Sequence, residues 1–176
     1  EMVVRSALTM KMLCSERTGG IAAAATFGLP EEVGGERNWD YRFTWIRDAS
    51  LTASTLAALG FTSELTAFVR WLAARYADSD QDGMLQIMYG IDGRKDLTEQ
   101  SLDNLSGYRN SAPVRIGNGA YNQLQLDIYG EMMVAVDSYD RTCQQISHDL
   151  WSQVSHSINW VCNNWQRTDE GVWEVR

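Results

Sequence analysis

Apolar residues recur at steps of three and four along several segments of the chain, which is the spacing of one buried helix face. Leu65, Phe68, Val69 and Leu72 illustrate the pattern in one of these segments. Glycine after the second segment and Ser147 before the last are typical helix-ending and helix-starting residues. We therefore predict an all-α chain with about five helices, over about 2–15, 45–59, 63–76, 118–139 and 147–165.

The connections between the predicted helices differ greatly in length. Only a few residues around Gly60 separate the second helix from the third, so these two should pack as antiparallel neighbours. By contrast, residues 78–117 carry no helical pattern, and only 85–91 read as a short strand. Connections of this length within compact domains are usually functional.

The segment 34–56 combines residue types that a soluble protein rarely places together. Charged and amide side chains alternate there with aromatic ones: Arg37, Asn38, Asp40 and Arg42 among Trp39, Tyr41, Phe43 and Trp45. Aromatic rings offer flat surfaces on which a sugar stacks, while Arg and Asp pair with its hydroxyl groups. The pattern is typical of a site for a polyhydroxylated ligand. The alternative is a solvated loop whose aromatic residues only anchor it to the domain.

Length, composition and charge indicate how many domains the chain forms and which classes of partner are not expected. A chain of 176 residues with 44% hydrophobic content can bury one core, so a single domain is expected. The formal net charge is −8 and no basic cluster stands out, which argues against nucleic acid and membrane surfaces as partners. No apolar run approaches the length that spans a bilayer.

The cysteines and histidines predict neither a disulfide framework nor a metal site. Cys14, Cys143 and Cys162 are odd in number and far apart, and neither His148 nor His156 has a cysteine at ligand spacing. We expect buried free thiols in a reducing compartment, hence a cytoplasmic protein. No metal and no cofactor is predicted.

One acidic stretch imitates a calcium site. Residues 78–83 have the opening spacing of an EF-hand loop, with Gly83 at the sixth place. The twelfth place, however, holds Tyr89, where the motif requires a bidentate Glu. Calcium binding is therefore not predicted.

Three long motifs resemble glycoside hydrolase family 15, which includes glucoamylases, glucodextranases and bacterial-type trehalases. They are GGERNWDYRFTWIRDASLT at 34–52, the stretch from Asp82 to Glu131, and DEGVWEVR at 169–176. The motifs occur in the family's order and cover nearly the whole chain. The resemblance implies an (α/α)6 barrel with its active site among the loops at one end.

The chain accounts for only the N-terminal part of such a barrel. Residues 1–176 would form a partial catalytic domain that stops before the second catalytic carboxylate. We expect an incomplete barrel to leave inner apolar positions such as Leu124, Ile128 and Met132 uncovered.

The resemblance places the family's general acid at Glu174. Burial between the apolar side chains of Trp173 and Val175 is an environment in which a carboxyl group holds a proton near neutral pH. The alternative from the residues alone is a loop carboxylate paired with Arg176. Asp169 and Glu170 are acidic neighbours of this position.

The resemblance also names substrate-binding residues. Arg47 and Asp48 match the pair that holds the glucose at the non-reducing end, although Arg beside Asp is also ordinary at a helix start. Trp45 and Trp173 flank these polar groups, and Tyr108 is a candidate stacking surface. A further candidate is Arg115, where relatives bring an additional polar contact.

Together these motifs imply a segment of an inverting, exo-acting α-glucoside hydrolase. Its general base lies in a later motif than any in these residues, so the segment alone should be inactive. Glu36 and Asp40 are a pair that a retaining enzyme would require, but nothing in the sequence places them across a cleft. The expected substrate is trehalose, a maltooligosaccharide or an isomaltooligosaccharide, between which the sequence does not choose.

Two other functions remain open at this level. One is a non-catalytic barrel that binds carbohydrate or a protein partner, as in the regulatory subunits of phosphorylase kinase. The other is a phosphorylase-type helical barrel, which would need a phosphate site in place of the base.

Overall fold

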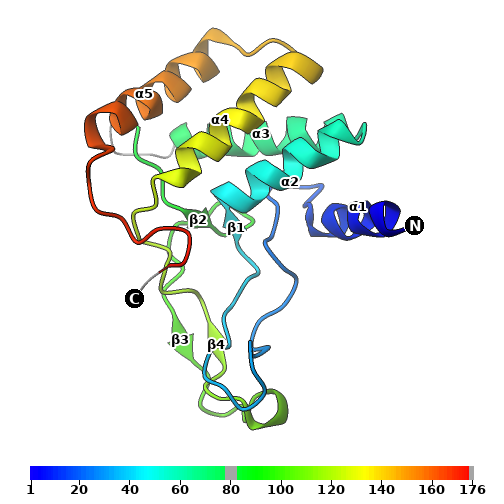
Figure 1. The fold of residues 1–176 in the computed structure, drawn as a ribbon, viewed down its shortest axis with the longest axis vertical. Coiled ribbons are helices and arrows are strands. Elements are labelled where there is room, and N and C mark those ends of the chain that lie inside the picture. The colour runs from blue at the N-terminus through cyan, green and yellow to red at the C-terminus, as the bar shows by residue number, and fades with distance from the viewer. Residues whose placement is uncertain (78–82, 175–176) are drawn as a thin grey trace.

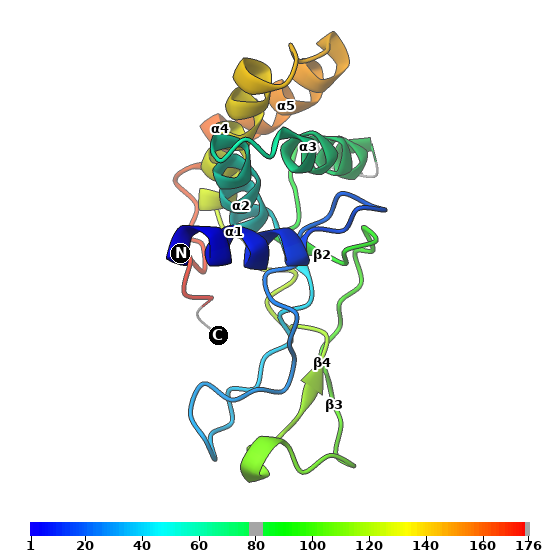
Figure 2. The same ribbon diagram turned by 90° about the vertical axis from the view of Figure 1, so that its right-hand side faces the viewer.

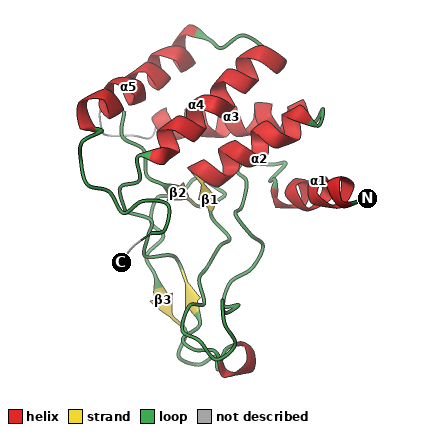
Figure 3. Cartoon of the chain, viewed as in Figure 1, coloured by secondary structure: helices red, strands yellow, loops and turns green. Residues whose placement is uncertain are grey.

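The computed structural model describes residues 1–77 and 83–174 and shows a predominantly helical chain (Figures 1 and 3). The helices of this part are α1 (Met2–Leu13), α2 (Ile46–Ala58), α3 (Thr62–Ala77), α4 (Asp127–Thr142), α5 (His148–Asn164) and the short 3-10 helix η1 (Tyr108–Asn110). The strands are β1 (Thr44–Trp45), β2 (Met88–Tyr89), β3 (Gln100–Ser101) and β4 (Arg115–Ile116). The prediction of an all-α chain with about five helices is confirmed.

The helices form two hairpins, α2 with α3 and α4 with α5, and α2 lies beside α4 (Figure 1). Both α2 and α4 begin at the end of the bundle that faces the loops. An ion pair joins their first turns, with 3.0 Å between Nη1 of Arg47 and Oδ2 of Asp127. Stacked helical hairpins whose N-termini share one end are the arrangement of a partial (α/α)6 barrel.

The hydrophobic core lies between α2, α3 and α4 and includes the buried side chains of Leu56, Phe68, Ile128 and Met132. The expectation that an incomplete barrel exposes Ile128 and Met132 is wrong, because the facing hairpin covers them. The hydroxyl of Tyr76 on α3, for example, contacts the sulfur of Met132 at 2.8 Å.

Exposed apolar side chains gather instead on α1, which lies against the side of α2 (Figure 2) and pairs with α3 through Lys11 and Glu64. They are Met2, Val3, Val4, Leu8 and Met12. Large exposed apolar surface of this kind is unusual for an isolated soluble domain.

Local signals set the ends of α2 and α5 as the sequence predicts. Gly60 ends α2 with a positive φ of 93°, and the amide of Phe61 donates to the carbonyl of Leu56 at 2.9 Å. Together with the bond from Gly60 to Ala57, this is a Schellman motif. At the start of α5, the hydroxyl of Ser147 accepts a hydrogen bond from the amide of Leu150 at 3.1 Å.

Helix α4 begins nine residues later than its periodicity predicts, at residue 127 instead of 118. The amides of Leu124 and Leu126 donate to carboxylates of the C-terminal segment, Glu170 Oε2 at 2.9 Å and Asp169 Oδ2 at 2.8 Å. Because these carboxylates already accept hydrogen bonds from the two amides, the amides do not require the carbonyl acceptors that a helix would provide. Residues 118–126 form turns instead.

The long connections form a lobe of loops below the helices, held by two small sheets (Figures 1 and 2). β1 pairs with β2 in antiparallel register, with Thr44 opposite Tyr89. This pairing confirms the centre of the strand predicted at 85–91. β3 pairs with β4 further from the bundle. The β1–β2 pair ties the connection between α3 and α4 to the aromatic segment, residues 37–45, at the base of α2.

The three cysteines are free thiols. Cys14 and Cys143 are half-buried, but Cys162 is exposed, contrary to the expectation that all three are buried. No helix in the described part of the chain is both long and apolar enough to cross a membrane. The same residues contain no cluster of His, Cys, Asp or Glu that could hold a metal. The imitation calcium loop falls largely at 78–82, outside the described ranges.

Candidate active site

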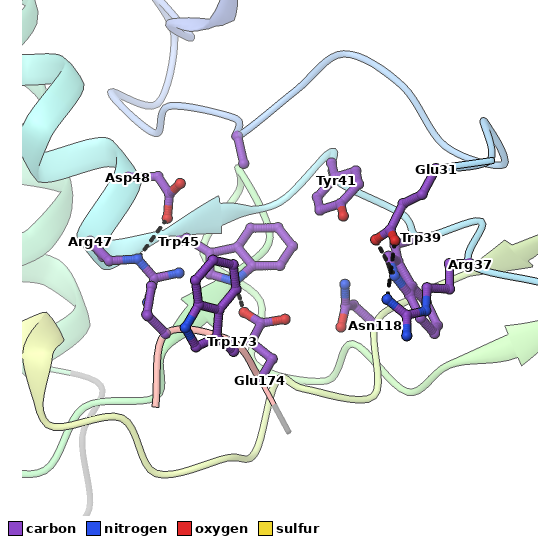
Figure 4. A pocket seen from close by; sticks show the side chains of 12 residues that line it. Glu31, Arg37, Trp39, Tyr41, Trp45, Arg47, Asp48, Asn118, Trp173 and Glu174 are labelled. Carbon is purple, nitrogen blue, oxygen red and sulfur yellow. Dashed lines mark hydrogen bonds and ion pairs between the residues drawn. The ribbon is translucent and has the colours of Figure 1, made fainter. Parts of the chain in front are cut away.

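A cavity of about 660 Å³ opens where the aromatic segment, the start of α2 and the C-terminal segment meet (Figure 4). Its walls combine aromatic rings, carboxylates and guanidinium groups. The lining residues are Ala23, Glu31, Arg37, Trp39, Tyr41, Trp45, Arg47, Asp48, Asn118, Val172, Trp173 and Glu174.

The aromatic segment points every second side chain into this cavity. Arg37, Trp39 and Tyr41 line it, as successive odd positions of an extended chain do on one face. The intervening residues turn away. Asn38 is buried, and its side-chain amide donates to the carbonyls of Gly35 and Pro113 at 3.2 and 3.1 Å.

Asp40 has a structural role on the far side of the same segment. Its buried carboxylate accepts two hydrogen bonds from the guanidinium of Arg42, both at 2.8 Å, and one each from the amides of Arg42 and Gly117, both at 3.2 Å. Both carboxylate oxygens are therefore occupied, away from the cavity. Asp40 is unsuited to pair with Glu36 as the catalytic carboxylates of a retaining enzyme.

One end of the cavity is formed by the first turn of α2. Nη1 of Arg47 donates to Gln125 at 2.7 Å and to Asp127 at 3.0 Å, which fixes the guanidinium group. Nε of Arg47 lies 3.4 Å from Oδ2 of Asp48. That oxygen is buried, while the Asp48 side chain as a whole is 47% exposed. A carboxylate held in this way offers its open side to a ligand.

The centre of the cavity holds Glu174 against Trp45. The indole Nε1 of Trp45 donates to Oε1 of Glu174 at 2.7 Å. Among the described residues, the other carboxylate oxygen has no hydrogen-bond partner. Trp45 itself is buried, so its position is set by the core. One oxygen of Glu174 is thus fixed by a rigid ring and the other is available.

The C-terminal segment is anchored before it reaches Glu174. Besides accepting from Leu124 through its side chain, Glu170 donates its amide to the carbonyl of Leu124 at 3.1 Å. Asp169 binds the amide of Leu126. These two carboxylates are therefore anchors of the C-terminal segment rather than solvated neighbours of Glu174. A turn closed by the amide of Glu174 and the carbonyl of Gly171, at 3.1 Å, then brings Glu174 to the cavity.

Glu174 adopts a backbone conformation that side chains with a Cβ rarely take, with φ of 51°. Residues held in the left-handed region cost free energy and occur often at functional sites. Trp173 beside it is 86% exposed and projects from the cavity wall (Figure 4).

Tyr41 lies between the carboxylates of Glu31 and Glu174 in the cavity wall (Figure 4). Burial raises its pKa, and the nearby negative charges of Glu31 and Glu174 raise it further. The hydroxyl therefore stays protonated at neutral pH and remains a hydrogen-bond donor. Its ring lies 6.0 Å from that of Trp45, so the two form a continuous aromatic wall.

The other end of the cavity is formed by Trp39 and an ion pair. Glu31 accepts a hydrogen bond from Nε1 of Trp39 at 3.2 Å through Oε1, and its Oε2 lies 3.4 Å from Nη1 of Arg37. The guanidinium of Arg115 covers the Trp39 ring, 4.9 Å from the ring centre. Arg115 is held in turn by the carbonyl of Glu36 at 2.7 Å and by Glu99 at 3.3 Å.

Five of the seven residues singled out from the sequence meet in this cavity: Trp45, Arg47, Asp48, Trp173 and Glu174. Tyr108 does not, because η1 lies in the lobe of loops far from α2, and its ring is 49% exposed (Figure 1). Arg115 does not line the cavity either, and its guanidinium lies over the Trp39 ring.

Sequence reasoning missed Glu31 and Asn118. It placed Arg37, Trp39 and Tyr41 in a candidate sugar-binding segment but did not single them out as site residues. The two-residue alternation of the aromatic segment would have placed Arg37, Trp39 and Tyr41 on one face. No local signal marks Glu31 or Asn118, whose places depend on how the loops pack.

The helical hairpins and the aromatic cavity with its carboxylates define a protein of the (α/α)6 glycosidase class. The chain belongs to the glycosyl hydrolases family 15, whose family model matches residues 1–176. It is 44% identical over 173 residues to a trehalase of Mycolicibacterium smegmatis. A trehalase of Mycobacterium tuberculosis is 42% identical over 173 residues.

Each of these matches covers 98% of this chain but only 26% and 25% of the relatives. The chain therefore spans about a quarter of the length of the curated relatives it matches. A solved structure of a glycosidase variant in complex with glucose has the same fold, with a TM-score of 0.61 at 18% identity. That match covers 98% of this chain and 42% of the glycosidase.

Proposed function

We propose that the protein hydrolyses an α-glucoside with inversion, that its substrate is trehalose, and that this chain supplies the general acid and the terminal-glucose site. Glu174 would be the acid, and Arg47 with Asp48 would hold the glucose at the non-reducing end. The matched relatives are trehalases, and a glycosidase of the same fold binds glucose, which supports this substrate class.

The observation that carries the proposal is the hydrogen bond from Trp45 to Glu174 beside the Arg47–Asp48 pair. A general acid must keep one oxygen directed at the glycosidic oxygen that it protonates. Trp45 fixes Oε1 of Glu174, so Oε2 can carry the proton that is transferred. Trp45 and Tyr41 supply the aromatic wall against which the glucose ring would lie.

The reaction follows from this assignment. Glu174 donates its proton to the bridging oxygen, the bond from that oxygen to the anomeric carbon breaks, and the leaving glucose departs with the proton. A water activated by a general base attacks from the opposite face, at a carboxylate separation of about 6.5–9.5 Å in inverting enzymes. We assign the base to no residue of this chain, and we expect these 176 residues alone to release no glucose.

Glu174→Gln in the complete encoded protein tests the acid. The amide keeps the shape of the side chain but has no proton to donate, so trehalose hydrolysis should fall by about 10²–10⁴-fold or more. Binding should change little. Glu131→Gln, on α4 and outside the cavity, is the matched control and should retain activity.

Product analysis tests the mechanism and the alternatives. An inverting enzyme releases one β-glucose and one α-glucose from each trehalose, which proton NMR distinguishes before mutarotation. Trehalose binding without any glucose release would favour a non-catalytic barrel, and hydrolysis only of maltose or isomaltose would contradict trehalose as substrate. If the Glu174→Gln variant retained a tenth of the activity, Glu174 would not be the general acid.

A further inference from the structure

We infer that Gln125 is a positioning residue of the proposed reaction, because it holds Arg47 to the same turn that anchors the segment carrying Glu174. The inference rests on the proposed function, in which Arg47 binds the terminal glucose and Glu174 is the acid. Gln125 itself does not line the cavity, so it acts on the reaction only through Arg47.

The turn at residues 124–127 is bonded to both functional parts of the cavity. Through its backbone, the amides of Leu124 and Leu126 donate to carboxylates of the C-terminal segment at 2.9 and 2.8 Å. Through its side chain, Gln125 accepts a hydrogen bond from Nη1 of Arg47 at 2.7 Å. The same short turn therefore sets where Arg47 lies and where the segment with the proposed acid lies.

The distance between these two parts matters for the reaction. The acid must reach the oxygen that is bonded to the glucose held by Arg47 and Asp48. A displacement of about 1 Å between reacting groups can lower the rate by about 10²-fold. A residue that ties Arg47 to the acid segment therefore contributes to catalysis without touching the substrate.

Gln125 is better suited than Asp127 to fix the guanidinium group of Arg47. Gln125 is 1% exposed, whereas the Asp127 side chain is 36% exposed, so water can replace the Asp127 carboxylate but not the Gln125 amide. A guanidinium group has only donors, which requires the amide oxygen of Gln125 to face it. The NH2 group of Gln125 donates to Oε1 of Gln123 at 3.2 Å and so fixes this orientation. A neutral acceptor also leaves the positive charge of Arg47 available to Asp48.

The test is a double-mutant cycle in the complete encoded protein. Gln125→Met keeps the length of the side chain but removes the acceptor, and it is made both in the unmodified protein and together with Arg47→Ala. Gln125→Glu keeps an oxygen acceptor at the same place. Steady-state kcat/KM for trehalose and the unfolding temperature are measured for every variant.

We expect Gln125→Met to lower kcat/KM for trehalose by about tenfold to 100-fold, as the loss of a hydrogen bond to a charged group does. In the Arg47→Ala background the same substitution should change kcat/KM by less than about twofold, because no guanidinium group remains to be held. Gln125→Glu should lose less than Gln125→Met, since it still accepts from Arg47.

The matched control is Gln86→Met, which makes the same chemical change away from Arg47. The Gln86 side chain donates to the carbonyls of Met88 and Lys95 at 2.7 and 2.8 Å and does not line the cavity. Losing these bonds should lower the unfolding temperature, while kcat/KM for trehalose stays within about twofold of the unmodified protein.

Equal losses from Gln125→Met in both backgrounds would overturn the inference, since they would place its effect in folding and not in Arg47. Full activity of Gln125→Met, or a loss in Gln125→Glu as large as in Gln125→Met, would overturn it as well. Should Gln125→Met not fold, Gln125→Asn, whose shorter side chain withdraws the acceptor, takes its place in the cycle. If the unmodified protein hydrolysed no trehalose, the proposed function itself would fail and this role with it.

Discussion

Trp45 and Glu174 lie 129 positions apart in the chain, yet Nε1 of Trp45 donates a 2.7 Å hydrogen bond to Oε1 of Glu174. Trp45 closes strand β1 immediately before α2, and Glu174 follows a turn after α5. The bond therefore joins the first hairpin to the segment that leaves the second. It also orients the carboxyl group that we propose as the acid.

Replacing Trp45 by Phe should lower kcat for trehalose by tenfold to about 100-fold. The ring still fills the site, but the hydrogen bond to Glu174 is lost. This bond becomes charge-assisted as the carboxyl group gives up its proton in the transition state, and such bonds contribute about 1.5–3 kcal/mol. Trp71→Phe is the control, because Trp71 is also buried and its Nε1 donates to the carbonyl of Ile91 at 3.3 Å, away from the cavity. Full activity in Trp45→Phe would show that this bond does not serve the acid.

Asp48→Asn should reduce kcat/KM by tenfold to about 150-fold, because a charged hydrogen bond to a sugar hydroxyl contributes about 1.5–3 kcal/mol. Since the contact belongs to the terminal glucose, the loss should be similar for trehalose and for longer α-glucosides. A loss confined to long substrates would place Asp48 at a distant subsite.

Asp127→Asn distinguishes the proposed glucose contact of Asp48 from the ion pair by which Asp127 holds Arg47. Asp127 pairs with the same guanidinium group at 3.0 Å but does not line the cavity. Arg47 keeps its bond to Gln125, so activity should fall by less than about threefold, in line with the weak contribution of partly exposed ion pairs.

Gly117→Ala should destabilise the protein by about 3 kcal/mol or more. Gly117 has φ of 75°, and a Cβ there would lie 2.2 Å from the carbonyl oxygen of Thr98. Gly34→Ala is the control, since Gly34 has φ of 84° but nothing lies within 4 Å of its added Cβ. It should show only the cost of the left-handed backbone, about 1–2 kcal/mol. Denaturant unfolding measures both, and equal losses would contradict the clash.

The thiol of Cys14 should resist alkylation in the folded protein. Burial, together with the negative charge of Glu64, raises its pKa to about 11, although Lys11 partly offsets the shift. At pH 8 the reactive thiolate is then scarce, and modification by iodoacetamide should be roughly 10²-fold slower than for an ordinary thiol. Peptide mapping before and after denaturation measures the difference, and raising the pH towards 11 should reduce it. Equally fast labelling in both states would contradict the burial.

The sequence alone determined the helical architecture. Residues such as Leu65, Phe68 and Leu72 are neighbours on one helix face. Their spacing is therefore visible in the sequence and predicts the helix without knowledge of the fold. Gly60 and Ser147 act through backbone groups only a few residues away, and both ends fell where expected. The family motifs in the sequence likewise identified Arg47, Asp48 and Glu174 as candidate site residues. The structure places all three in one cavity.

Only the tertiary structure decided how those groups are held and which others join them. The start of α4 moved because Asp169 and Glu170, over 40 positions away, bind the amides of Leu126 and Leu124. The guanidinium of Arg115, on β4, lies over the Trp39 ring. Glu31 reaches the cavity from the same connection between α1 and β1 as Trp39. The contacts of α4 and of Arg115 join segments that are distant in sequence, and hydrophobic periodicity reports only on a segment's own faces. Long-range packing, which no local pattern encodes, therefore built the site around residues that the sequence had already supplied.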